Sequence, residues 1–111
     1  MIEITILNHL NSSLNVDVAL EKPEPLPNEY VLFEKTGSNR NNHLVSSTFA
    51  FQSYSTSLYS TSLLNELTKE AVDSLIELDE IASVRLNTDY NFTDSTTKQY
   101  RYQAVYDIKH Y

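Results

Sequence analysis

The stretch from His43 to Leu78 changes its hydrophobic period once, and this change constrains the fold more than any other feature of the chain. Up to Tyr54, apolar and polar residues alternate, which predicts a strand. One face of that strand carries Val45, Ser47, Phe49 and Phe51. Beyond Tyr54 the apolar residues recur with the 3.6-residue period of a helix. The predicted apolar stripe comprises Leu58, Ser62, Leu63, Leu67, Ala71, Leu75 and Leu78, widened by Leu64, Val72 and Ile76.

The Ser/Thr/Tyr-rich segment between these two patterns is therefore a strand-to-helix junction, because the leucines keep helical register through it. Ser55 and Ser57 are both suitable N-caps, since a serine hydroxyl can accept from a free N–H of the first turn. The outer face of the predicted helix is acidic. It carries Glu66, Glu70, Asp73 and Glu77, with Lys69 as the only nearby cation.

Shorter patterns account for the rest of the chain. A helix is predicted over Ile2 to Ser13, then a short strand of alternating residues from Val16 to Leu20 and an extended proline-rich connector, "KPEPLP". The apolar segment Glu29–Lys35 and the strand beginning at His43 form a hairpin around a polar loop, and a second hairpin spans Glu80 to Tyr111. The predicted fold is α+β. A mainly antiparallel sheet of about four or five strands, with two hairpins, carries an N-terminal helix and one long central helix on one face.

Composition narrows the class of protein. The 111 residues suffice for a single domain, 1–111, and 41% of them are hydrophobic. The absence of cysteine excludes disulfides and zinc–thiolate sites and fits synthesis in a reducing cytoplasm. The net charge of −7 disfavours specific nucleic-acid binding, which needs a basic face. No apolar run approaches the roughly 20 residues of a membrane span, so no membrane contact is expected.

The sequence offers little for catalysis. The three histidines, His9, His43 and His110, lie far apart, and His43 is the most exposed candidate for acid–base work. The four carboxylates of the long helix could hold a divalent cation, but a solvated helix face explains them better. The single glycine, Gly37, argues against a phosphate-binding loop and a nucleophile elbow. We therefore predict no catalytic, cofactor-binding or metal-ligating residues and no enzyme activity, with a small enzyme or ligand-binding domain as the less favoured alternative.

Two features are typical of protein contact surfaces. The predicted hairpin loop is the candidate interface and comprises Thr36, Gly37, Ser38, Asn39, Arg40, Asn41 and Asn42. The second feature is the strip of Tyr100, Tyr102 and Tyr106 in the last strand, where Tyr suits surfaces that are wet when free and dry in a complex. An ordinary core position beneath the helix is the favoured explanation of this strip, and partial exposure at a subunit interface is the alternative.

The order of these elements, with "YVLFEKTGSNRNNHLVSSTFAFQSYS", a leucine-rich helix and a closing "KQYRYQAVYDIKHY", resembles a known family. It is similar to the tail-terminator and minor capsid (head–tail joining) proteins of long-tailed bacteriophages, the group that includes the lambda tail terminator. The resemblance covers nearly the whole chain. It rests on the order of the elements, the chain length and the general residue pattern, so no individual functional residue is carried over.

The resemblance implies a structural virion protein at the head–tail junction, without cofactors. Such proteins form a ring of copies, six in the virion, that caps the tail tube, stops its growth and docks to the head connector. The expected partners are thus other copies of this chain, the tail tube protein and the head connector protein. A head-completion, connector or other minor capsid protein of related fold is the alternative.

Overall fold

The computed structural model describes residues 1–111 and confirms the predicted α+β fold. The elements in chain order are α1 (Ile2–Ser13), β1 (Asp17–Ala19), β2 (Tyr30–Asn41), β3 (Leu44–Tyr54), α2 (Leu58–Asp73), the 3-10 helix η1 (Ser74–Glu77), β4 (Ile81–Asn91) and β5 (Arg101–His110). The bounds of α1 agree with the prediction, and the strands predicted in the last third are β4 and β5.

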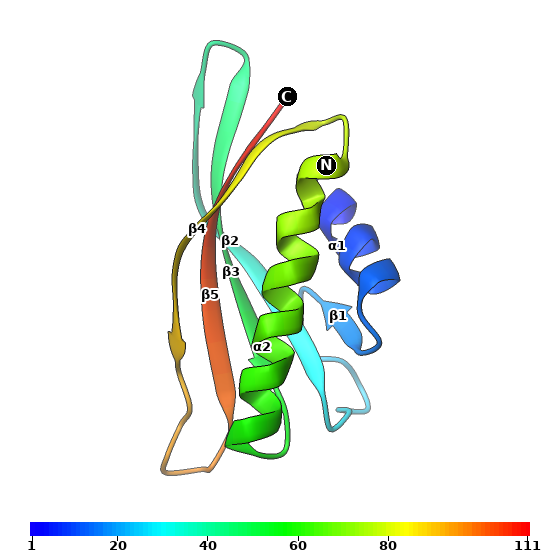
Figure 1. The fold of residues 1–111 in the computed structure, drawn as a ribbon, viewed down its shortest axis with the longest axis vertical. Helices are drawn as coiled ribbons and strands as arrows, with labels where there is room; N and C mark the ends of the chain where they lie inside the picture. The colour runs from blue at the N-terminus through cyan, green and yellow to red at the C-terminus, as the bar shows by residue number, and fades with distance from the viewer.

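All five strands form one sheet in the order β1-β2-β3-β5-β4. β1 pairs parallel to β2, and every other pairing is antiparallel. Figure 1 shows both helices on one side of this sheet, with the other side bare. The core lies between the helices and the covered face. Its largest fully buried side chains include four aromatic rings, those of Phe33, Phe49, Phe51 and Tyr106.

The junction between β3 and α2 is capped by Ser57, which decides between the two predicted caps. The Ser57 hydroxyl accepts a hydrogen bond of 3.1 Å from the backbone N–H of Ser60, one of the N–H groups that the first turn leaves free. Ser55 instead donates to a carboxylate oxygen of Glu29 at 2.9 Å. The serine-rich segment therefore starts the helix, as predicted.

The apolar stripe predicted for the long helix was right for Leu64, Ala71, Val72 and Leu75, which are buried, and wrong for four other members. Leu58, Leu63, Leu67 and Ile76 are exposed. The buried face comprises Thr61, Leu64, Asn65, Thr68, Ala71, Val72 and Leu75. Threonine can be buried here because its hydroxyl is satisfied locally: Thr61 donates to the carbonyl of Ser57 at 2.6 Å, and Thr68 donates to that of Leu64 at 2.8 Å.

The predicted loop over Thr36–Asn42 was also wrong, because β2 continues to Asn41 and stays paired with β3. The turn consists of Asn42 and His43, both with positive φ (52° and 71°), as a two-residue hairpin turn of the primed type requires. The segment looks loop-like because it projects beyond the helices (Figure 1) and is exposed on both faces. A strand that covers no core does not need apolar residues at every second position. Its sequence therefore lacks the alternation by which a strand is predicted.

Candidate protein interface

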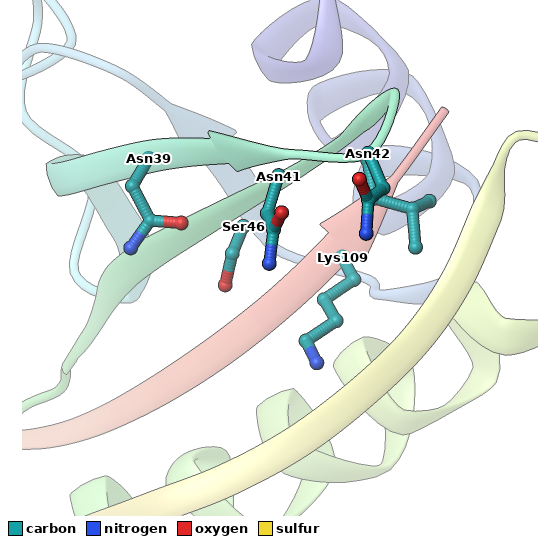
Figure 2. Close-up of a pocket in the computed structure, with 6 residues that line it drawn as sticks. Asn39, Asn41, Asn42, Ser46 and Lys109 are labelled. Carbon is teal, nitrogen blue, oxygen red and sulfur yellow. The ribbon is translucent and has the colours of Figure 1, made fainter.

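The projecting part of the β2–β3 hairpin contains the residues of the predicted interface loop. All six residues from Thr36 to Asn41 are exposed. On the bare side of the sheet, the hairpin and the end of β5 enclose a polar hollow of about 390 Å³. Its lining residues are Asn39, Asn41, Asn42, Leu44, Ser46 and Lys109. Figure 2 shows the asparagine side chains and Lys109 directed to the same side of the hairpin. Amides and an ammonium group suit hydrogen bonding to another protein.

The charge of this region differs from that of the whole chain. From Lys35 to Asn65 there is no Asp or Glu, although the chain carries a net charge of −7. Arg40 lies near the hairpin tip, and Lys109 lines the hollow beside it. The carboxylates lie elsewhere, and two of them, Asp79 and Glu80, directly precede β4. The projecting part of the hairpin, Thr36–Asn41, thus carries no carboxylate, whereas two carboxylates stand at the start of the edge strand.

Two stretches of strand edge have no neighbour within the chain. β4 is the last strand of the sheet, so its outer edge is free along its length. β1 pairs with β2 only at residues Tyr30 to Leu32, so the projecting part of β2 also has a free outer edge. A free edge presents unpaired N–H and C=O groups to another chain. β4 carries irregularities between Ile81 and Ser83 and between Leu86 and Thr88, which limit indiscriminate pairing.

The strand pairings place these two free edges at the same level of the sheet. One row of paired residues runs through Ile81, His110, Val45 and Arg40. A second row runs through Leu86, Tyr106, Phe49 and Lys35. The first half of β4 and the projecting part of β2 therefore bound the same rows from opposite sides. The three intervening pairings are all antiparallel, so β4 and β2 run in opposite directions.

The tyrosine strip of β5 is divided between core and partial exposure. Tyr106 is buried beneath α2, and its hydroxyl donates to Asp73 Oδ1 at 3.0 Å and to the carbonyl of Lys69 at 3.3 Å. Burial and the bond to Asp73 both raise the pKa of Tyr106. Tyr100 and Tyr102 are half-buried. The core interpretation of the strip thus holds for Tyr106.

Other polar aromatic groups lie on the bare side of the sheet. The rings of Tyr30 and Tyr54 stack with centroids 4.5 Å apart. The Tyr54 hydroxyl donates to Gln52, which donates to Gln103 at 2.8 Å, and Gln103 donates to Tyr90. This chain of side-chain hydrogen bonds joins three strands, β3, β5 and β4, and stiffens a face that no helix covers. The strand alternation predicted that Gln52 and Gln103 lie on this face, but it did not predict their hydrogen bonds.

The leucines misassigned to the core border a shallow apolar groove. It lies between the α1–β1 connection and α2 and measures about 400 Å³. Its apolar lining is Leu14, Val16, Leu63, Leu64 and Leu67. Leu67 is 53% exposed, whereas Leu64, one helical turn away, is 4% exposed. The groove is thus a surface feature whose rim is apolar.

The predicted acidic face of α2 is exposed along Glu66, Glu70 and Asp73, and Glu77 follows in η1. Lys69 forms ion pairs with Glu66 at 3.0 Å and with Asp89 of β4 at 2.9 Å. Asn65 donates to the same Asp89 oxygen at 3.0 Å. The hydrogen bond from Lys69, reinforced by that from Asn65, lowers the pKa of Asp89. The hydrogen bond to Asp89 in turn raises the pKa of Lys69. This cluster ties the helix to the edge strand.

The three histidines remain apart in the fold. His9 Nε2 lies 2.7 Å from the hydroxyl of Ser74, which links α1 to the end of α2. His43 is exposed in the hairpin turn, and His110 lies at the end of β5. No group of three or more His, Asp or Glu side chains converges on one point where it could hold a metal ion.

Comparison of the sequence with models of known protein families finds no match, and comparison with curated proteins finds none either. Neither helix combines the length and apolar composition needed to cross a membrane.

Proposed function

We propose that this chain is a structural bacteriophage protein of the head–tail junction, a tail terminator whose copies form a ring on the tail tube and dock to the head connector. The observation that carries this proposal is the projecting hairpin together with two free strand edges on opposite sides of the sheet. Ring assembly needs two different complementary surfaces on each copy, and two free strand edges that run in opposite directions are suited to that role. The proposal places the protein in the virion after synthesis in the host cytoplasm.

The family resemblance also supports this function. The resemblance implies the order helix, strand, hairpin, long helix, hairpin, and this is the order of the elements in the chain. Its implied mechanism is complementarity of edges and loops between subunits. The exposed polar hairpin suits a contact that is wet in the free subunit and closed in the assembly.

Electron microscopy of the purified chain mixed with self-assembling tail-tube protein from the same genome tests this proposal. Rings at tube ends and tubes of restricted length are expected, against long uncapped tubes when the chain is omitted. Unaltered tubes at saturating chain would refute the terminator function. Binding to the connector protein in place of the tube would identify a head-completion protein instead.

A matched pair of variants tests whether the hairpin takes part in capping, either by docking or through the contact between copies. Asn39→Glu with Asn41→Glu adds charge to the hairpin, and Ser95→Glu with Thr97→Glu adds the same charge to the exposed loop between β4 and β5. That loop lies at the opposite end of the molecule (Figure 1). Capping should fall only in the hairpin variant. Equal capping by both variants would exclude the hairpin from the docking surface.

A further inference from the structure

We propose that copies of this chain join head to tail by extending the sheet, with β4 of one copy pairing antiparallel to the projecting part of β2 of the next. This inference specifies the contact between copies and rests on the proposed ring-forming function for its biological meaning. In this arrangement, the free edge of β4 is covered by β2 of one neighbouring copy. The free edge of β2 is covered by β4 of the other neighbouring copy.

The direction and level of the two strands support this pairing. β4 and β2 run in opposite directions, so placing them side by side gives an antiparallel ladder without turning either molecule over. They also bound the same rows of the sheet. The row through Ser83, Lys109, Ser46 and Asn39 is one example. When β4 and β2 of two copies lie side by side with these rows aligned, Ser83 of one copy lies opposite Asn39 of the next.

Only the projecting part of β2 can accept a new strand. Lower on β2, Leu32 is paired with Ala19 of β1, so β1 occupies that edge. This confines the pairing to the first half of β4, where the row of Ile81 ends at Arg40. A short strand pairing of this kind is weak alone and needs a further source of specificity.

Charge complementarity supplies that specificity. In the proposed alignment, Glu80 and Asp79 lie beside Arg40 of the next copy, and the projecting part of the hairpin, Thr36–Asn41, contains no carboxylate. Pairing two β2 edges would instead bring together two projecting segments that each carry Arg40 and no carboxylate. Like charges brought together disfavour association, whereas opposite charges fix the register. The contact is heterologous, since each copy contributes a different edge, and heterologous contacts generate rings when the rotation closes.

Cross-linking tests the alignment on a background that has no cysteine. A chain carrying Ser83→Cys and Asn39→Cys should yield a ladder of covalently linked copies under oxidation. Directly opposed residues of an antiparallel pair are about 4.5–5.5 Å apart between Cα atoms, within the range of a disulfide. The control combines Asn39→Cys with Tyr90→Cys, because the row of Tyr90 ends at Leu32, which β1 covers. The control should yield no ladder.

A charge exchange provides an independent test in the full-length chain. Arg40→Glu should weaken self-association roughly tenfold, as judged by sedimentation at high concentration and on tube ends. Adding Glu80→Arg to this variant should restore self-association, because each contact then again joins opposite charges, with the two signs exchanged. Adding Glu70→Arg, an equal change on the exposed face of α2, should not.

The outcomes separate this inference from the proposed function. If the wild-type chain caps tubes but the Ser83/Asn39 cysteine variant gives no ladder, free or on tubes, the edge pairing is wrong and the terminator function stands. If the ladder forms and tubes are not capped, the edge pairing is right and the terminator function is wrong. A linked dimer from Ser83→Cys alone would indicate symmetric pairing of two β4 edges and overturn the head-to-tail arrangement.

Discussion

The position of α2 on the sheet predicts very different effects for the same substitution at neighbouring leucines. Leu64→Ala and Leu67→Ala remove the same atoms from the same helix, so the change in helix propensity is equal. Leu64 is 4% exposed and belongs to the core cluster, and Leu→Ala in such a site costs about 2–5 kcal/mol, including the cavity left behind. Leu67 is 53% exposed. Its truncation should cost about 1 kcal/mol or less, because only about half of the side chain leaves an apolar contact and no cavity forms.

Urea unfolding followed by circular dichroism measures this difference. With a denaturant slope of about 1–3 kcal/mol per molar urea, the midpoint of Leu64→Ala should lie roughly 1 M below that of Leu67→Ala. Both variants should be measured at several protein concentrations so that self-association does not contribute to the comparison. Equal midpoints would refute the observed orientation of α2 and favour the stripe that the sequence pattern predicts.

Three further predictions concern polar groups. Ser57→Ala should lower the free energy of unfolding by about 1 kcal/mol, because it removes the N-cap of α2, whereas Ser55→Ala should change it less; urea midpoints compare the two. Ser47→Ala should leave the free energy of unfolding, measured by thermal unfolding, unchanged or raised, because the buried Ser47 hydroxyl has no hydrogen-bond partner. A decrease of more than about 1 kcal/mol in that free energy would contradict this. Asp89→Asn should destabilise the fold at neutral pH. The lowered pKa of Asp89 means that its contribution is present above the usual value of 3.8 and disappears as the pH falls through the folded pKa, so the stabilities of wild type and variant should converge in acid.

The sequence alone determined much of the architecture through local patterns. The alternation in "STFAFQSY" predicted β3 with Phe49 and Phe51 on the buried face, and the change of period after Tyr54 predicted α2. These predictions succeeded because strand and helix periods are properties of the backbone, and a half-buried element must place apolar residues at its own period. For the same reason, the alternation in the last strand placed Ala104, Tyr106 and Ile108 on the covered face.

The orientation of α2 was decided only in the tertiary structure. A helix with leucines over much of its circumference can pack on more than one face, and the choice depends on what the sheet presents. Here Ser53 of β3 lies 3.1 Å from Thr68, hydroxyl to hydroxyl, so a face with small polar side chains can approach the sheet closely. Leu63 and Leu67 remain outside, on the rim of the groove. Local hydrophobicity carries no information about that distant partner.

The candidate interface was likewise predictable from the sequence only in part. Composition identified Thr36–Asn42 as exposed and polar, since these residues would be unsuited to a core. That they form a paired strand, and that this strand has a free edge level with β4, depends on pairings between residues far apart in the chain. In the hairpin, the sequence thus determined which residues reach the surface, whereas the tertiary structure decided which edges they present, because hydrogen-bonded pairing across a sheet is a non-local property.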